Sequence, residues 1–184
     1  MPALTSATDR PHWQEQVDWP TSARTTAFGR HLAAFLRAGD LVVLTGDLGA
    51  GKTTLTQGIG AGLGVRGRIS SPTFIIARTH RSVGEGPHLV HVDAYRLHSL
   101  PEIDDLDLDT ALEESVMVVE WGAGLVEDLA EDRLEITINR QRGAGGDVGE
   151  QPRTAIIAGY GRRWAAIEPH VLTRPPEAEG QEAR

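Results

Sequence analysis

The stretch Gly46-Asp47-Leu48-Gly49-Ala50-Gly51-Lys52-Thr53-Thr54 decides the fold that we expect for this chain. It fits the pattern G-x-x-x-x-G-K-[ST] and follows the apolar run 41–44. Glycines let the backbone curl around a polyphosphate with its N–H groups inward, and a helix starting near Lys52 adds the positive end of its dipole. Lys52 would then reach the β- and γ-phosphates, and the Thr53 hydroxyl would face Mg²⁺. The stretch therefore predicts a nucleotide-binding loop after a strand.

The use of lysine supports this interpretation. Lys52 is the single lysine of the chain, and all other basic side chains except the histidines are arginines. A compact ammonium on a flexible stem suits a position between phosphates better than a planar guanidinium does.

Composition narrows the class of protein. The chain has 184 residues, 40% of them hydrophobic, which suits one domain. Its net charge of −8 argues against a free-standing nucleic-acid binder, although it leaves RNA contact through a partner open. There is no cysteine and no apolar run near the roughly 20 residues of a membrane span. We therefore expect a cytoplasmic protein.

The order of apolar patterns predicts an α/β fold. We expect a flexible lead-in over residues 1–18, one domain over 19–168 and a disordered tail over 169–184. A helix should begin at Thr21 or Ser22 and end at Gly39. Further helices are expected at 52–63 and 110–114, and strands at 41–45, after Pro72, before Asp93, and at 116–121, 134–140 and 153–161. The alternation favours a P-loop NTPase-like, mostly parallel sheet flanked by helices, with an antiparallel C-terminal edge.

Two carboxylates are expected at the ligand end of this sheet. Asp93 and Glu120 each follow an apolar run, and ligands bind outside the carboxyl ends of parallel strands. One carboxylate could hold Mg²⁺ beside Thr53 while the other orients the attacking water, and either could be an ordinary solvated group. The spacing alone does not assign these roles.

Two further residues flank the expected site. Thr73 lies where many P-loop proteins place a threonine that senses Mg²⁺ or the γ-phosphate, but a plain strand-edge threonine fits as well. Trp121 follows Glu120 and could cover the nucleotide, meet a partner or cap the core.

Four separated segments together resemble one family. GDLGAGKTT, SPTF, HVDAYRL and EW occur in the order and at about the separations of the TsaE (YjeE) family, and the resemblance covers roughly residues 20–160. It implies a small P-loop ATPase that binds ATP and Mg²⁺ and acts with the TsaB and TsaD proteins. Their pathway forms N6-threonylcarbamoyl on adenosine 37 of ANN-decoding tRNAs. TsaD would perform the transfer, and ATP hydrolysis would reset the complex.

The resemblance also implies roles for individual residues. The loop 47–54 would cradle the phosphates, Thr53 and Glu120 would hold Mg²⁺, and Asp93 and Thr73 would act with Lys52 in hydrolysis. Ser22 and Thr25 would touch the adenine end of the nucleotide, Trp121 would lie beside the metal-ligating glutamate, and Arg153 would open the final strand and approach the nucleotide. The cofactor-binding set is thus Ser22, Thr25, Asp47, Leu48, Gly49, Ala50, Gly51, Lys52, Thr53, Thr54, Trp121 and Arg153.

The sequence departs from the family pattern at several places, one of them the stretch ending LAEDRLEI, which lacks the usual Leu-Pro. Gly122 stands where a proline is common, and the linker 143–152 is long, which puts the alignment of Arg153 in doubt. Two other functions are compatible with the loop. A small-molecule kinase would need an arginine-rich lid and an acceptor pocket, neither of which is clear, and a nucleotide-dependent binding module would hydrolyse ATP only incidentally.

Overall fold

A single seven-stranded sheet organises the molecule. The computed structural model describes residues 10–73, 76–97, 108–140 and 151–174. The strands are β1 (Trp13–Trp19), β2 (Leu41–Thr45), β3 (Ala77–His80), β4 (His88–Asp93), β5 (Ser115–Glu120), β6 (Arg133–Arg140) and β7 (Arg153–Tyr160). The helices are α1 (Ser22–Ala33), α2 (Lys52–Leu63), α4 (Leu108–Glu113), α5 (Gly161–Ala165) and α6 (Pro169–Thr173), with the 3₁₀ turns η2 (Ala94–Arg96) and η3 (Glu127–Leu129).

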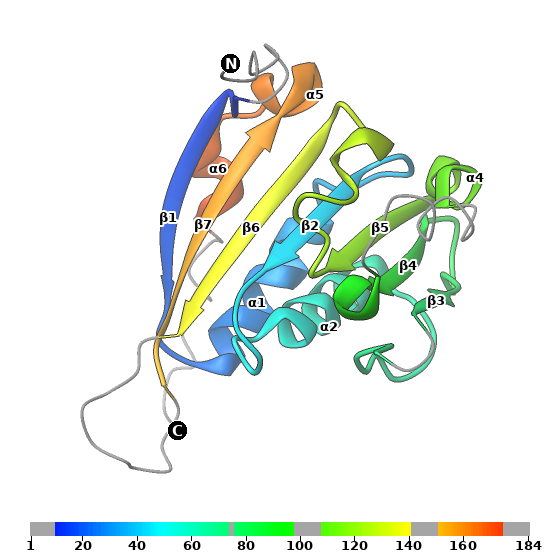
Figure 1. Ribbon diagram of the computed structural model, residues 1–184, viewed down its shortest axis with the longest axis horizontal. Coiled ribbons are helices and arrows are strands. Elements are labelled where there is room, and N and C mark those ends of the chain that lie inside the picture. Colours follow the sequence, from blue (N-terminus) through cyan, green and yellow to red (C-terminus); the bar gives the residue numbers. More distant parts are fainter. Residues whose placement is uncertain (1–9, 74–75, 98–107, 141–150, 175–184) are drawn as a thin grey trace, which may run out of the picture.

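The sheet combines a parallel centre with antiparallel edges. Its order is β1-β7-β6-β2-β5-β4-β3 (Figure 1). Strands β6, β2, β5 and β4 run parallel to one another, whereas β7 and β1 at one edge and β3 at the other pair antiparallel. The α/β fold with an antiparallel C-terminal edge is therefore confirmed.

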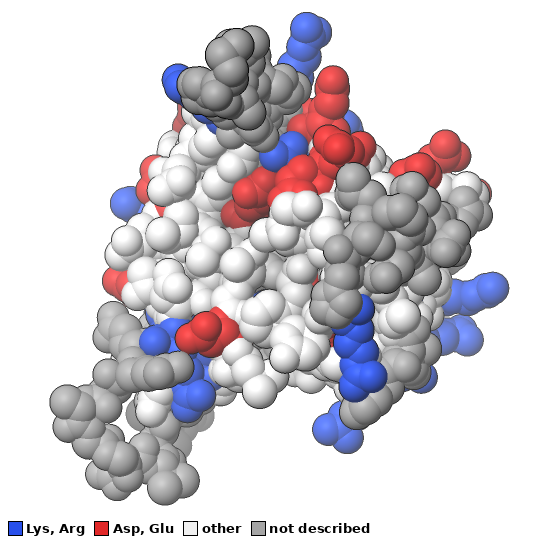
Figure 2. All heavy atoms as spheres, viewed as in Figure 1, with Lys and Arg blue, Asp and Glu red and all other residues white. Residues whose placement is uncertain are grey.

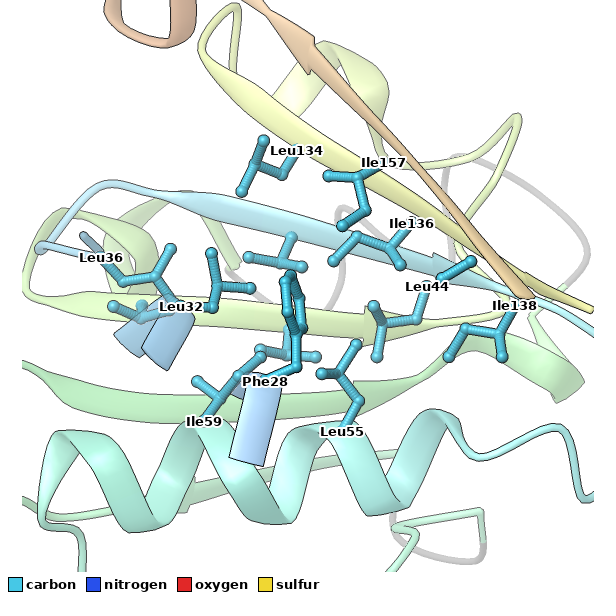
Figure 3. Close-up of a cluster of buried hydrophobic side chains, with 14 of the residues drawn as sticks. Phe28, Leu32, Leu36, Leu44, Leu55, Ile59, Leu134, Ile136, Ile138 and Ile157 are labelled. Carbon is cyan, nitrogen blue, oxygen red and sulfur yellow. The ribbon is translucent and has the colours of Figure 1, made fainter. Parts of the chain in front are cut away.

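The two central strands are buried on both faces. In β2, Val42 and Leu44 pack in the core under α1 and α2, whereas Leu41 and Val43 pack in a second core on the opposite face. Figure 3 shows the first core, in which Phe28 of α1 and Leu55 of α2 meet the strand side chains. This two-sided burial explains why the apolar runs are continuous. The second core is closed by side chains of α4 and of the segment 125–130.

Helices α1 and α2 touch through their backbones. A Cβ atom built on Gly29 of α1 would lie 2.6 Å from the carbonyl oxygen of Leu55, and one built on Gly58 of α2 would meet the carbonyl oxygen of Thr26. Only glycine permits this approach. The contact fixes how α2, whose first residue is Lys52, lies on the sheet.

The expected lead-in is wrong for residues 13–18. Strand β1 pairs antiparallel with β7 from Trp13 opposite Gly159 to Trp19 opposite Arg153. Trp19 is buried and packs on Phe28, with ring centroids 5.0 Å apart. Residues 1–9 lie outside the described part of the chain.

The expected disordered tail is wrong for residues 169–173. These residues form α6, whose Leu172 is buried in the core beneath α1. The Nε2 atom of His31 in α1 lies 2.9 Å from the carbonyl oxygen of Val171. Residues 175–184 and most of the linker 143–152 lie outside the described residues.

Two other boundaries differ slightly from expectation. The first helix ends at Ala33, and the chain reaches Gly39 (φ +90°) through a turn. The acidic segment 101–114 is described only from Leu108, where α4 begins two residues before the expected Thr110. None of the helices in the described ranges has the length and apolar content that crossing a membrane requires.

A buried histidine lies on the edge strand β3. His80 is 4% exposed, and its Nε2 atom has no hydrogen-bond partner among the described residues. Burial lowers the pKa of His80 below its ordinary value of 6.5, a hydrogen bond with the backbone of Arg66 opposes this, and the neighbouring side chains of His91 and Arg78 add to the lowering. The folded state therefore favours neutral His80.

Burial of Trp19 predicts that β1 belongs to the folded unit. Trp19→Ala should lower the free energy of unfolding by about 3–5 kcal/mol, because it removes a large side chain from the core. Gln16→Ala, at an exposed position of the same strand, should change it by less than about 0.5 kcal/mol. Urea denaturation measures both. Equal and small effects would show that residues 13–19 do not contribute to the core.

The lowered pKa of His80 predicts acid sensitivity. Because the unfolded chain binds the proton more readily, stability should fall as the pH drops below the unfolded value near 6.5, and the loss should stop below the folded pKa. One such site contributes at most about 1.4 kcal/mol per pH unit. Denaturation from pH 7.5 to 4.5 should therefore show a shallower fall for His80→Gln than for the wild type. Parallel curves would contradict this prediction.

Candidate active site

Three parallel strands end at the same edge of the sheet. Leu44 of β2 pairs with Glu120 of β5, and Glu120 pairs with Asp93 of β4. The loop that follows β2 therefore lies beside both carboxylates, as the positions of the apolar runs predict.

The glycine loop has a backbone shape that other residues adopt only under strain. Gly46, Gly49 and Gly51 have φ angles of +149°, +77° and +114°. A Cβ atom on Gly46 would also collide with the carbonyl oxygen of Ile138 in β6. Gly51 caps the N-terminus of α2 without a side-chain hydrogen bond. The loop thus gives an anion access to the first turn of a twelve-residue helix.

Lys52 is held under this loop. Its Nζ atom donates to the carbonyl oxygens of Gly46 at 2.7 Å and Asp47 at 3.0 Å, and lies 3.8 Å from the centre of the Trp121 ring. Burial lowers the pKa of Lys52, whereas the nearby carboxylates of Glu120, Asp93 and Asp47 act in the opposite direction. The lysine therefore lies in a desolvated position where a negative ligand would favour its charged form.

Thr53 and Glu120 are in direct contact. The Thr53 hydroxyl donates to Oε1 of Glu120 at 2.8 Å. Glu120 is 3% exposed and ends the buried strand β5. A hydroxyl and a carboxylate are hard oxygen ligands of the kind that Mg²⁺ takes from proteins. Thr53 and Glu120 therefore have the chemistry to hold Mg²⁺, the role that the family resemblance implies for them.

Asp93 belongs to a separate hydrogen-bond network. Its Oδ2 atom accepts from the hydroxyls of Ser71 at 2.9 Å and Thr73 at 2.6 Å, and its Oδ1 accepts from the backbone N–H of Tyr95 at 3.0 Å. The Ser71 and Thr73 hydroxyl oxygens are 2.6 Å apart. Asp93 thus fixes the segment that carries Thr73, and a plain strand-edge position for this threonine is ruled out because β3 starts only at Ala77.

Trp121 covers the lysine. It has a φ of +63°, which is unusual for a bulky residue, and its backbone N–H donates to the carbonyl oxygen of Leu44 at 2.9 Å. Its ring packs on Tyr95 at 5.2 Å between centroids. This places Trp121 in the site, beside Lys52, and away from the core.

Arg153 reaches the loop from β7. Its Nε atom donates to the carbonyl oxygen of Ala50 at 3.0 Å, and a Cβ on Gly51 would lie 3.0 Å from the same nitrogen. Arg153 therefore lies beside the glycine loop, as expected, despite the long linker that precedes it in the sequence.

A cavity of about 390 Å³ joins these groups. Its lining comprises Leu48, Gly49, Gly51, Lys52, Thr53, Thr54, Ser71, Thr73, Asp93, Tyr95, Glu120, Trp121 and Arg153. Among the expected cofactor-binding residues, Ser22, Thr25, Asp47 and Ala50 do not line it. Thr25 is fully buried in α1, and its hydroxyl donates to the carbonyl oxygen of Thr21. Contact of Ser22 and Thr25 with an adenine stays a prediction.

The sequence interpretation missed three residues of the site. Ser71 and Tyr95 line the cavity. His91 contacts Glu120, with its Nε2 atom 2.8 Å from Oε1. Ser71 lies two residues before Thr73, and His91 two residues before Asp93, on the same face of β4. This alternation was the available signal.

The parallel sheet, the glycine loop and α2 define a P-loop fold. The family model for threonylcarbamoyl adenosine biosynthesis protein TsaE matches residues 19–147. The chain belongs to the TsaE family.

Named relatives agree with this assignment. The tRNA threonylcarbamoyladenosine biosynthesis protein TsaE of Streptomyces coelicolor is 60% identical over 145 residues, covering 78% of this chain and 96% of that protein. The protein of the same name from Bacillus subtilis is 41% identical over 145 residues, covering 77% and 87%. The crystal structure of Bacillus subtilis YdiB matches with a TM-score of 0.61 and 30% identity over 83% of this chain and 89% of that chain.

The backbone of Gly46 generates a prediction on the loop. Gly46→Ala should lower the free energy of unfolding by roughly 1–3 kcal/mol, because the methyl group meets Ile138 and strains the backbone. Gly84→Ala is the matched control, since a Cβ there meets nothing within 4 Å. Thermal unfolding compares the two, and equal midpoints would contradict the geometry described for the loop.

Proposed function

We propose that the protein binds ATP with Mg²⁺ and hydrolyses it slowly, in support of threonylcarbamoyl modification of adenosine 37 in ANN-decoding tRNAs. It would act with TsaB and TsaD. The observation that carries the nucleotide part is the contact of Thr53 with Glu120 at 2.8 Å beside Lys52 under the glycine loop. The pathway is supported by membership of the TsaE family and by the names of its relatives.

The loop would bind the polyphosphate. The free backbone N–H groups in the first turn of α2 would donate to a negative ligand, and the helix dipole favours that charge. Lys52 would exchange its carbonyl partners for phosphate oxygens, and the nearby Trp121 ring would shield the pair from water.

Thr53 and Glu120 would hold Mg²⁺. The cation, when bound, neutralises charge on the β- and γ-phosphates. The Thr53 hydroxyl has two lone pairs and one proton, so it can continue to donate to Glu120 while a lone pair faces the cation.

Asp93 would orient the attacking water. It lines the cavity with Thr73 and the glycine loop and is tied to the segment 71–73, so its carboxylate is held in place and could accept a proton from water. The separation of the two networks favours this division of roles, with the metal at Glu120 and the water at Asp93.

Contact with tRNA would be made through partners. Acidic side chains outnumber basic ones in the chain, 26 to 18. On the face shown in Figure 2, acidic side chains gather in one area and basic ones are scattered. An RNA-binding protein would normally show a basic face.

The test of the proposed function compares ATP turnover alone and with TsaB plus TsaD. We expect weak turnover alone, stimulation by the partners and retention on immobilised TsaB–TsaD that depends on ATP. Lys52→Ala should abolish support for tRNA modification in a strain lacking its own copy. Unchanged turnover with no retention would refute the partnership, and phosphorylation of a small molecule would favour a kinase.

Separate variants test the two carboxylates. Glu120→Ala should weaken Mg²⁺-dependent ATP binding by roughly 10–100-fold, because it removes a proposed ligand. Asp93→Ala should leave binding nearly intact and reduce hydrolysis by roughly 10²-fold or more. Calorimetric titration and single-turnover hydrolysis measure both effects, and each variant is the control for the other. The reverse pattern would overturn the assignment.

A further inference from the structure

His91 is a buried side chain that the proposed reaction does not use. It is fully buried on β4, and its Nε2 atom lies 2.8 Å from Oε1 of Glu120. Because His91 pairs with Val118 and Asp93 pairs with Glu120, His91 is the diagonal neighbour of Glu120 on the adjacent strand. It therefore supports the carboxylate from the interior of the sheet.

The hydrogen bonding indicates which nitrogen carries the proton. The Nδ1 atom of His91 is buried and has no hydrogen-bond partner among the described residues. A proton on Nδ1 would leave an unsatisfied buried donor, whereas a proton on Nε2 is donated to the carboxylate. The Nε2–H form fits both observations.

Both hydrogen bonds found for the Glu120 side chain end on the same oxygen. Thr53 donates to Oε1 from the loop side, and His91 meets Oε1 from the interior. We propose that His91 is a positioning residue, whose Nε2–H holds Oε1 and so directs Oε2 of Glu120 toward the cavity, where the cation is expected. This inference rests on the proposed function.

The physical reason is the flexibility of glutamate. A glutamate side chain has several rotatable bonds and loses rotamer entropy when it is fixed. A second donor, buried and rigid on the neighbouring strand β4, fixes the carboxylate before any ligand arrives. Outer partners of metal ligands commonly have this effect.

The test measures the Mg²⁺ concentration that gives half-maximal binding of the fluorescent analogue mant-ATP to the full chain. His91→Leu should raise this concentration roughly tenfold or more and leave the Mg²⁺-free affinity unchanged. His91→Gln, whose amide nitrogen can take the place of Nε2, should lie close to the wild type. His91→Asn, whose shorter side chain does not reach Glu120, should behave like His91→Leu.

His80→Leu is the matched control. It removes another buried histidine, from the neighbouring strand β3, whose register partner on β4 is Leu89. Its thermal midpoint should fall while its Mg²⁺ dependence stays that of the wild type. If His91→Leu does not fold, the comparison of His91→Gln with His91→Asn decides.

The outcomes are distinct. A His91→Leu or His91→Asn protein with reduced stability but wild-type Mg²⁺ dependence would overturn the positioning role and leave the proposed function standing. A wild-type protein without Mg²⁺-dependent nucleotide binding would overturn both. Nitrogen chemical shifts of the His91 ring give an independent readout, since a proton on Nδ1 would also refute the inference.

Discussion

The site depends on one buried carboxylate. Glu120 is 3% exposed, and a charge in such a position is tolerated only when it is paired and hydrogen-bonded. Its partners come from two elements: Thr53 and, through space, the ammonium of Lys52 from α2, and His91 from β4. Helix α2 and strand β4 thus meet strand β5 at a single oxygen atom, Oε1 of Glu120, and the position of each element restricts the positions of the others.

Trp121 shows that the same region carries conformational strain. A bulky residue at φ +63° costs of the order of 1–3 kcal/mol, and it persists only where its surroundings hold it. Here the backbone is fixed by Leu44 at the end of β2, and the ring is fixed between Lys52 and Tyr95. The chain therefore leaves β5 in a direction that places an aromatic wall beside the lysine.

Local patterns were sufficient for part of the structure. The glycine loop, the central strands and the edge where Asp93 and Glu120 meet follow from motif spacing and from continuous apolar runs. Strand β1 was missed because WQEQVDW has few apolar positions and is exposed along most of its length, as an edge strand can be. The partnership of His91 with Glu120 depends on the register between two strands 29 residues apart, which no local pattern contains.

The glycine contact between α1 and α2 links distant parts of the molecule mechanically. Helices separated by side chains can absorb small shifts through rotamer changes. At Gly29 and Gly58 no side chain lies between the two helices, so such an adjustment is not available there. A tilt of α1 is therefore transmitted to α2, and α2 begins with Lys52, the residue proposed to bind the phosphate. Larger residues at this crossing should therefore shift the first turn of α2 as well as destabilise the fold. Which substitutions are tolerated here depends on the orientation of α2 as well as on stability.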